Sequence, residues 1–356
     1  MSPQPSTAPP TEPKRTDPPG VATAYLSVRK KLLFGLTCGI APLVAAELIC
    51  RLAGLGALRG VEESISVWHR SPDGKSFWVL QGREYNADGV RDRPRPIEKP
   101  PGVYRIACLG DSVTMGYGLD PAESYPHWLE VYLRQASAPA EVFNIALAGW
   151  STEQELAAYQ KIARKYRPDH VFLGVCLNDI PEMHNNLAAP PPRAIGLLMR
   201  HSAFVRWLAD AEARQVHTVE ELFGQPASPA VESGWQALFA TLLELDKQTR
   251  GDGCPLSVVV FPFRFQLADD APEPTVQRRL CRFCQEHGIP CMDLLPVLGE
   301  LGETAFVDES HFSLAGAQAV ARELIRWQRS GCRQCGFEFS GVDAPACPRC
   351  GTPFER

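Results

Sequence analysis

The feature that most constrains the fold of this chain is a regular alternation of two kinds of segment between residues 103 and 328. Short apolar runs rich in strand-forming residues alternate with longer segments whose apolar residues recur with helical spacing. The runs predict strands at residues 103–109, 142–147, 170–176, 256–261 and 289–292. The longer segments predict helices at residues 125–135, 152–166, 231–250, 275–287 and 314–328. This alternation is typical of α/β domains, in which helices cover a parallel sheet.

We therefore predict a flavodoxin-like, three-layer α/β/α sandwich with a five-stranded parallel sheet at residues 101–330. A longer stretch, residues 180–230, separates the third strand from the fourth and contains a predicted helix at about residues 193–213. Because ligands bind at the carboxyl ends of parallel strands, we expect this insertion to act as a lid or to bind substrate. A surface helix without such a role is the alternative. Residues 56–100 are predicted to be a linker with a hairpin at about residues 77–85.

A serine follows the first predicted strand directly. Gly110 and Asp111 form a turn, so Ser112 is expected at the carboxyl edge of the sheet. A serine nucleophile needs a general base and a group that orients the base. Asp308 and His311, three residues apart on one loop, can supply both. The alternative is a turn in which the aspartate and serine side chains only cap the next helix.

Two further positions with hydrogen-bond donors follow other predicted strands. Gly149 follows the second strand, and Asn178 follows the third. A backbone N–H beside such a glycine and a side-chain amide are donors that stabilise a tetrahedral oxyanion. The sequence therefore supplies candidates for a nucleophile, a base, an orienting acid and an oxyanion hole.

The order of these residues resembles the SGNH, or GDSL-type, hydrolase superfamily over roughly residues 85–328. The matching positions are Gly110, Asp111 and Ser112, then Gly149, then Asn178 and Asp179, then Asp308 and His311. The resemblance implies an ester hydrolase that needs no cofactor for catalysis. It implies Ser112 as nucleophile, His311 as general base and Asp308 as its orienter. It further implies an oxyanion hole made of the Ser112 N–H, the Gly149 N–H and the Asn178 side chain. Cys176 stands where the family often has glycine, which puts the shape of the pocket wall in question.

The N-terminal region predicts a tail and a membrane anchor. Residues 1–30 are rich in proline, serine, threonine and charge, which is typical of a disordered tail. Residues 31–55 contain an apolar stretch that is long enough, as a helix, to cross a bilayer. A cleaved signal peptide is the alternative. The Glu47 and Arg51 pair and the long polar lead favour a retained, single-pass anchor.

The sequence leaves the side of the membrane open. More basic residues precede the apolar stretch than follow it, which favours a catalytic domain outside the cytoplasm. A cysteine-rich tail favours the cytoplasm, where thiols stay reduced. The formal net charge of −5 gives no electrostatic reason to expect binding to nucleic acid. Residues 86–91 resemble the lead-in of membrane-anchored members of the superfamily, although an Asx turn with a glycine at positive φ also explains them.

The C-terminal residues 331–356 contain two Cys-x-x-Cys pairs. The pairs are Cys332 with Cys335 and Cys347 with Cys350, and glycine follows each second cysteine. Four thiolates with this spacing are typical of tetrahedral structural zinc, and the segment resembles a short zinc ribbon. Two disulfides are the alternative. Such a ribbon is also a possible docking site for a protein partner.

Three functions fit these residues. The first is hydrolysis of an acyl or acetyl ester, on a small molecule or a glycan, through a covalent acyl-serine intermediate. The second uses the same residues as an O-acyltransferase or deacetylase acting on a cell-envelope polysaccharide. The third is a catalytically silent binding or scaffold protein that docks a partner through the zinc ribbon. The presence of all the parts of a hydrolytic site favours the first.

Overall fold

The computed structural model describes most of the chain between residues 27 and 329. The described residues are 27–53, 65–70, 76–136, 139–180, 197–199, 201–208, 219–224 and 226–329. The predicted tail lies outside them up to residue 26. The predicted zinc ligands, Cys332, Cys335, Cys347 and Cys350, also lie outside the described residues. The zinc ribbon therefore stays a prediction.

A five-stranded parallel sheet forms the centre of the domain, as predicted. Its strand order is β4 (Ala140–Ala146), β3 (Tyr104–Gly110), β5 (His170–Cys176), β6 (Leu256–Phe261) and β7 (Cys291–Asp293). β3 pairs with β4 on one side and with β5 on the other. Because all the strands are parallel, the residues that follow β3, β4 and β5 come together at one edge of the sheet.

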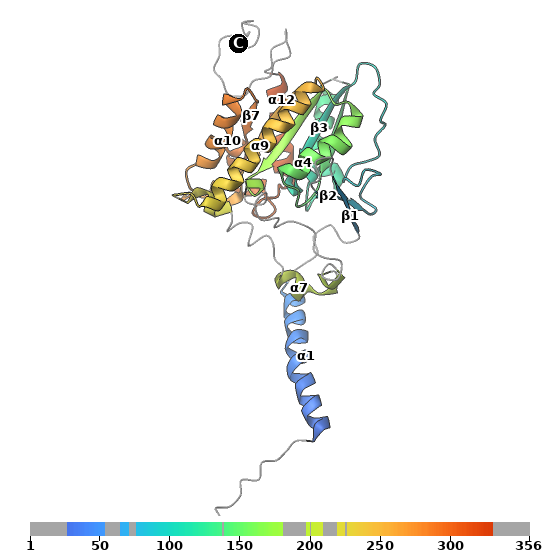
Figure 1. Cartoon of the computed structure of the whole chain (residues 1–356), viewed down its shortest axis with the longest axis vertical. Helices are drawn as coiled ribbons and strands as arrows, with labels where there is room; N and C mark the ends of the chain where they lie inside the picture. The colour runs from blue at the N-terminus through green and yellow to red at the C-terminus, as the bar shows by residue number, and fades with distance from the viewer. Residues whose placement is uncertain are drawn as a thin grey trace, which may run out of the picture.

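Helices cover both faces of this sheet, which confirms the three-layer sandwich (Figure 1). Helices α4 and α9 pack together on one face, and α3 packs against α12 on the other. The α-helices of the domain are α2 (Ser112–Met115), α3 (Tyr125–Gln135), α4 (Thr152–Ala158), α9 (Pro229–Gly251), α10 (Thr275–Glu286), α11 (Leu295–Gly299) and α12 (Leu314–Arg329). Helix α4 continues as a π-helical turn at Tyr159–Ala163 and a 3-10 turn at Arg164–Tyr166. Further 3-10 turns lie at Pro121–Glu123, Glu221–Phe223, Arg264–Leu267 and Gly302–Ala305.

The central strands are buried on both faces. Every residue of β5 and of β6 is buried, in agreement with their nearly continuous apolar sequences. Each large apolar side chain buried in this way stabilises the fold by about 1.5–3 kcal/mol. The rigid centre of the sheet fixes the positions at which the strands end.

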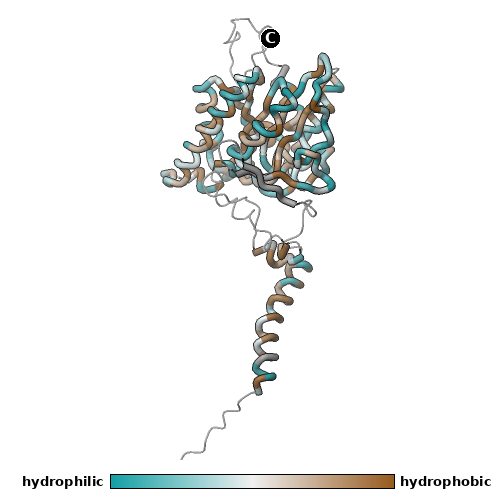
Figure 2. The backbone as a smooth tube through the Cα atoms, turned by 45° about the vertical axis from the view of Figure 1, so that its right-hand side comes forward, coloured by the Kyte–Doolittle hydropathy of each residue, from teal (hydrophilic) through white to brown (hydrophobic). Residues whose placement is uncertain are grey.

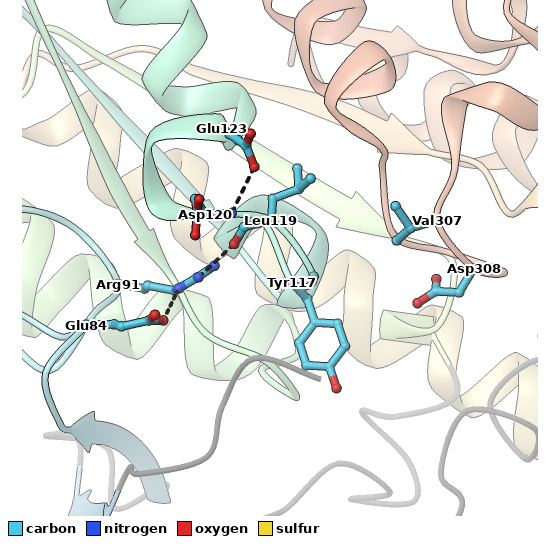
Figure 3. A pocket seen from close by; sticks show the side chains of 9 residues that line it. Glu84, Arg91, Tyr117, Leu119, Asp120, Glu123, Val307 and Asp308 are labelled. Atoms are coloured by element: carbon cyan, nitrogen blue, oxygen red, sulfur yellow. Dashed lines mark hydrogen bonds and ion pairs between the residues drawn. The ribbon is translucent and has the colours of Figure 1, made fainter. Parts of the chain in front are cut away.

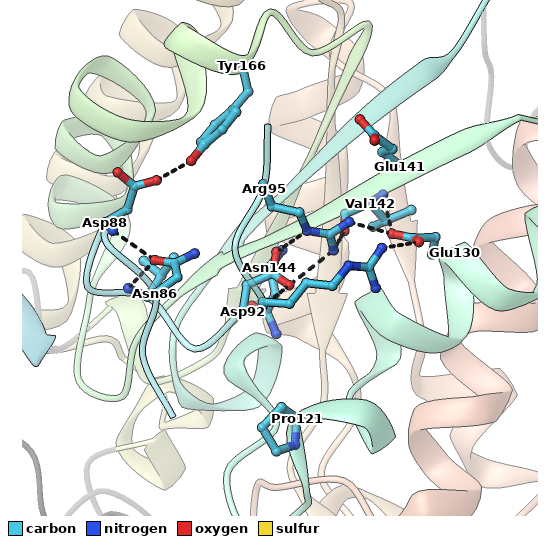
Figure 4. A network of polar contacts seen from close by, with 12 residues as sticks. Asn86, Asp88, Asp92, Arg95, Pro121, Glu130, Glu141, Val142, Asn144 and Tyr166 are labelled. Carbon is cyan, nitrogen blue, oxygen red and sulfur yellow. Dashed lines mark hydrogen bonds and ion pairs between the residues drawn. The ribbon is translucent and has the colours of Figure 1, made fainter. Parts of the chain in front are cut away.

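Side chains protect the outer edge of β4 (Figure 4). Glu130 on α3 accepts a hydrogen bond from the Val142 N–H at 3.0 Å, and Asp92 accepts one from the Asn144 N–H at 3.2 Å. Arg95 joins the two acids, with nitrogen–oxygen distances of 2.9 Å to Asp92 and 2.8 Å to Glu130. Arg95 also donates to the carbonyl of Val142. The polar groups along this edge are thus used within the domain, which opposes pairing with another chain.

The lead-in to the domain contains the Asx turn predicted at residues 86–91 (Figure 4). The side-chain oxygen of Asn86 accepts a hydrogen bond from the Asp88 N–H at 2.9 Å, and Gly89 has a φ of +74°. A Cβ atom on Gly89 would lie 2.6 Å from the Cβ of Val79. Both backbone conformation and close packing therefore require glycine at this position.

The predicted hairpin was placed too late in the sequence. The structure pairs β1 (Ile65–Arg70) with β2 (Ser76–Gln81), so the predicted span 77–85 covers only the second strand and the turn after it. A two-stranded ribbon is defined by the pairing of its strands, and the apolar run at residues 77–80 does not by itself show that its partner strand precedes it.

The N-terminal helix α1 (Val28–Leu52) is apolar along most of its length (Figure 2). It is the one candidate membrane span among the described residues, with a mean hydropathy of 2.0 over its most apolar window. Its length and composition fit a membrane anchor and also fit a signal sequence. Its carboxyl end contacts α7 (Ala203–Leu208), which belongs to the predicted lid-like insertion.

Candidate active site

The predicted nucleophile lies on the turn between β3 and α2. Asp111 caps α2 by accepting a hydrogen bond from the Val113 N–H at 2.9 Å, and Ser112 is the first residue of the helix. A Cβ atom on Gly110 would lie 2.1 Å from the hydroxyl oxygen of Thr114, so glycine is needed for this tight entry into α2. The two interpretations of this turn are therefore both correct in part. Asp111 caps the helix, and the half-buried Ser112 faces the site.

The loop before α12 is folded around the carboxylate of Asp308. One oxygen of this carboxylate accepts hydrogen bonds from the backbone N–H groups of Ser310, at 3.1 Å, and His311, at 2.8 Å. The Val307 N–H donates to the His311 carbonyl at 2.9 Å and closes the loop. These bonds fix the Asp308 carboxylate and the backbone of His311.

The two ring nitrogens of His311 join Asp308 to Ser112. His311 Nδ1 lies 2.9 Å from each carboxylate oxygen of Asp308, and Nε2 lies 2.8 Å from Ser112 Oγ. A carboxylate only accepts hydrogen bonds, so Nδ1 carries the proton of the neutral ring. Nε2 is then the acceptor for the Ser112 hydroxyl proton. This arrangement joins residues 199 positions apart in the sequence.

The environment of Asp308 keeps its carboxyl group ionised. Burial alone would raise the pKa of Asp308, but the hydrogen bonds and the charge of His311 outweigh it, so its pKa lies below the ordinary value of 3.8. The ionised acid holds the imidazole in the required tautomer. A base with this orientation can accept a proton from Ser112.

The two predicted oxyanion donors flank Ser112. β4 and β5 are the neighbours of β3, and Gly149 and Asn178 follow their carboxyl ends. Gly149 has a φ of +81°, in the turn closed by the hydrogen bond from the Trp150 N–H to the Leu147 carbonyl at 3.1 Å. The structure therefore brings all five predicted catalytic and oxyanion residues to one edge of the sheet.

Asp111 contacts the predicted oxyanion donor Asn178. The side-chain amide of Asn178 donates to Asp111 at 3.5 Å, and both side chains are buried. Burial raises the pKa of Asp111 above its ordinary value, while the hydrogen bond from the Val113 N–H lowers it. From the sequence, Asp111 was predicted only as part of the turn, since a contact with residue 178 depends on the pairing of β3 with β5.

Two other residues support the site and were not predicted. The ring of Tyr117 packs against the His311 imidazole, with centroids 4.6 Å apart. Arg91 is buried and donates to the carbonyls of Gly116, at 2.8 Å, and Leu119, at 2.7 Å, in the loop after α2. These two hydrogen bonds tie the lead-in segment to the loop that follows the nucleophile. The only sign of them in the sequence was the arginine at the end of the 86–91 motif.

A cavity of about 560 Å³ lies on the Asp308 side of these residues (Figure 3). Tyr117, Val307 and Asp308 form one wall, and Arg91 with Glu84 forms another. The remaining lining residues are Gly118, Leu119, Asp120 and Glu123. Residues 197–199 and 201–208 of the predicted lid do not line this cavity, and the lid role stays a prediction.

The fold and this site are those of an enzyme that hydrolyses ester bonds. The family model described as GDSL-like Lipase/Acylhydrolase family matches residues 108–319. The match covers more than half of the chain, and the chain therefore belongs to this family.

Solved structures with some similarity include esterases. A catalytic mutant of Axe2, an acetylxylan esterase from Geobacillus stearothermophilus, is 15% identical with a TM-score of 0.41, covering 63% of this chain and 93% of that one. The psychrotrophic esterase EstA from Pseudoalteromonas sp. is 14% identical with a TM-score of 0.39, covering 62% and 94%. At these values the similarity adds nothing to the family assignment. The comparison with curated proteins gave no match.

Proposed function

We propose that this protein is a serine esterase in which Ser112 is the nucleophile, His311 the general base and Asp308 the residue that orients His311. The observation that carries the proposal is the continuous line of hydrogen bonds from Asp308 through His311 to Ser112 Oγ. His311 Nε2 accepts the hydroxyl proton as Ser112 Oγ attacks the ester carbonyl carbon. Nδ1–H stays bound to Asp308, whose negative charge stabilises the imidazolium that forms.

The oxyanion of the tetrahedral intermediate is held by the Ser112 N–H, the Gly149 N–H and the Asn178 side chain in this proposal. Asp111 positions Asn178 by accepting from its amide. Collapse of the intermediate releases the alcohol, which takes the proton from His311. Water then attacks the acyl-serine with His311 again as base, and the carboxylic acid is released. The substrate is an acyl or acetyl ester of a small molecule or glycan, and no step uses a cofactor.

We further propose that α1 is a retained membrane anchor. The supporting observation is that Glu47 and Arg51, near its carboxyl end, make specific contacts with residues 201–204, about 150 positions later in the chain. A signal sequence is removed after it has directed export, so such contacts would have no place in the mature protein. The side of the membrane on which the catalytic domain lies is tested with a reporter fused after Arg356.

Replacement of the nucleophile tests the proposed chemistry. Ser112→Ala in the full chain should reduce the hydrolysis of a short-chain nitrophenyl ester by at least about 10⁴-fold, because the acyl-serine can no longer form. A fluorophosphonate probe should label the wild type and not this variant. Ser228→Ala removes a serine hydroxyl that only caps α9 at the Val231 N–H; it is the matched control and should keep both hydrolysis and labelling. Undiminished hydrolysis by Ser112→Ala would remove Ser112 from the mechanism.

A further inference from the structure

Several large apolar side chains are exposed on the described part of the 180–230 insertion. Leu197 and Leu198 are 59% and 58% exposed, and Leu208 at the end of α7 is 59% exposed. Trp207 is 43% exposed, and its ring stacks on that of Phe204 with centroids 6.1 Å apart. A group of leucines with a tryptophan, exposed on short helical segments, is typical of surfaces that contact another apolar phase.

These segments are attached to the carboxyl end of α1. The carboxylate of Glu47 accepts hydrogen bonds from the Ser202 hydroxyl at 2.7 Å and from the N–H groups of Ala203 at 3.0 Å and Phe204 at 2.9 Å. Arg51 pairs with Glu47 at 2.6 Å and donates to the His201 carbonyl at 2.9 Å. α7 is therefore held to the helix that we propose as the anchor.

With α1 as the proposed anchor, the attachment point lies at the level of the membrane surface. Glu47 lies in the last turn of the apolar stretch 32–50, and Arg51 directly follows that stretch, so both lie where α1 leaves the hydrocarbon core. Groups fixed to Glu47 lie in the headgroup region, where tryptophan is favoured because its ring is apolar and its N–H is polar. The apolar side chains beside α7 are thus next to a bilayer.

The active-site edge of the sheet faces the same way. In Figure 1, the amino end of α9 lies on the side of the domain that faces α7. In a sheet of parallel strands joined by helices, the amino ends of the helices and the carboxyl ends of the strands lie on one side. Ser112 follows the carboxyl end of β3, so it lies on that side too. Figure 2, turned by 45°, shows the same order of α1, α7 and domain.

We propose that the surface formed by Leu197, Leu198, Trp207 and Leu208 inserts into the headgroup region of the bilayer that α1 crosses. This contact keeps the active-site edge turned toward the membrane, so that esters carried at the bilayer surface reach Ser112 more readily than esters in free solution. The inference rests on the anchoring by α1 proposed above, and it adds a second membrane contact and a substrate class.

Depth-dependent quenching of tryptophan fluorescence tests the contact. The full chain is reconstituted into vesicles and recovered by flotation, and its emission is compared in lipids with and without bromine near the headgroup end of the acyl chains. Trp207 is one of seven tryptophans, so Trp207→Phe should remove up to about a seventh of the emission. The part removed should be the part that bromine at the headgroup level quenches. The matched control Trp128→Phe on α3 should leave the quenching by bromine as it is in the wild type.

The outcomes separate this inference from the function it rests on. Failure of the protein to float with the vesicles overturns both the anchor and the surface contact. Flotation with equal quenching of the wild type and Trp207→Phe overturns the membrane contact alone. The exposed apolar residues would then contact a second copy of the chain or another protein. Inactivity toward every ester would count against the proposed hydrolase without changing the quenching result.

A second measurement tests the orientation of the site. Leu198→Asp with Leu208→Asp should lower, severalfold, the ratio of the rate on a vesicle-borne ester to the rate on a soluble ester, because a charge in the headgroup contact weakens it. Ile97→Asp is the matched control: Ile97 is 57% exposed, and its carbonyl binds Arg105 near the amino edge of the sheet. It should leave the ratio unchanged. An equal ratio in all three proteins would contradict the orientation.

Discussion

The two edges of the central sheet both bury polar side chains, but they use them differently. At the carboxyl edge, Ser112 is half-buried and its hydroxyl is bound to a histidine that can accept its proton. At the amino edge, Arg105 is fully buried, and its side-chain N–H groups are used by neighbouring acceptors. The partners are Glu141 at 2.8 Å and the carbonyls of Pro96, Ile97, Glu98 and Tyr166 at 2.7–3.0 Å.

This difference shows that a buried polar group is not by itself a sign of catalysis. The guanidinium of Arg105 binds main-chain carbonyls and so fixes the lead-in segment and the end of the α4 region onto the sheet. The Ser112 turn instead leaves one hydroxyl within reach of both a base and a substrate. A catalytic polar cluster must leave one group accessible to a substrate. Of the two edges, the carboxyl edge meets that condition.

At the active edge, the largest effect after loss of the nucleophile itself is expected from Asp308→Asn. The amide cannot accept the Nδ1 proton as a carboxylate does, so His311 loses its tautomer and its charge partner, and kcat should fall by about 10³–10⁴-fold. Nitrophenyl ester hydrolysis measures the effect. Asp293→Asn is the control: Asp293 ends the outer strand β7, its carboxylate only accepts a hydrogen bond from the Leu295 N–H at 2.9 Å, and the variant should keep full activity. Equal activity in the two variants would separate Asp308 from the mechanism.

The structural edge should respond in stability and not in chemistry. Arg105→Met leaves Glu141 and several carbonyls without their donor, which should cost about 3–5 kcal/mol of unfolding free energy. For a domain of this size the melting temperature should fall by roughly 10 °C. The rate of ester hydrolysis per folded molecule should not change. The exposed pair of Arg326 with Glu323 offers the control Arg326→Met, for which a change within about 0.5 kcal/mol is expected.

The smallest effect is expected from His170, which is buried at the start of β5. Burial lowers its pKa from 6.5 to about 3, so the unfolded chain binds a proton in this range that the folded chain does not. Its contribution is therefore complete above pH 6.5 and is lost as the pH falls, by about 1.4 kcal/mol per pH unit. Urea unfolding at pH 7, 6 and 5 should show that the unfolding free energy of His170→Gln falls less with decreasing pH than that of the wild type. Parallel curves for this variant and the wild type would contradict the prediction, and His287→Gln, at an exposed site, is the control.

The secondary structure could be predicted well where the pattern was local. The spans 170–176 and 256–261 agree with β5 and β6, because a fully buried strand is a continuous apolar run. The fifth strand starts later than the predicted residue 289. Pro290 has no N–H to donate, and the Ile289 N–H closes the end of α10 by bonding to the Cys284 carbonyl at 2.8 Å. Competition between a strand and a helix end is not visible in an apolar pattern.

The candidate site could also be predicted in large part. Ser112, Gly149 and Asn178 each follow an apolar run, and Asp308 with His311 lies on one short loop, so local sequence together with the rule for parallel sheets located them. The partners of these residues could not be predicted in this way. The support of Arg91 for the nucleophile loop and of Tyr117 for His311 depends on how separate segments pack.

The sequence by itself determined the order of strands and helices, the apolar N-terminal helix and the residue types needed for ester hydrolysis, because these depend on spacing along the chain. Only the tertiary structure decided that Glu47 binds residues 202–204 and that Asn178 binds Asp111. The physical reason is that such contacts join segments about 65 to 160 residues apart, and their geometry is set by strand pairing and helix packing rather than by any local preference.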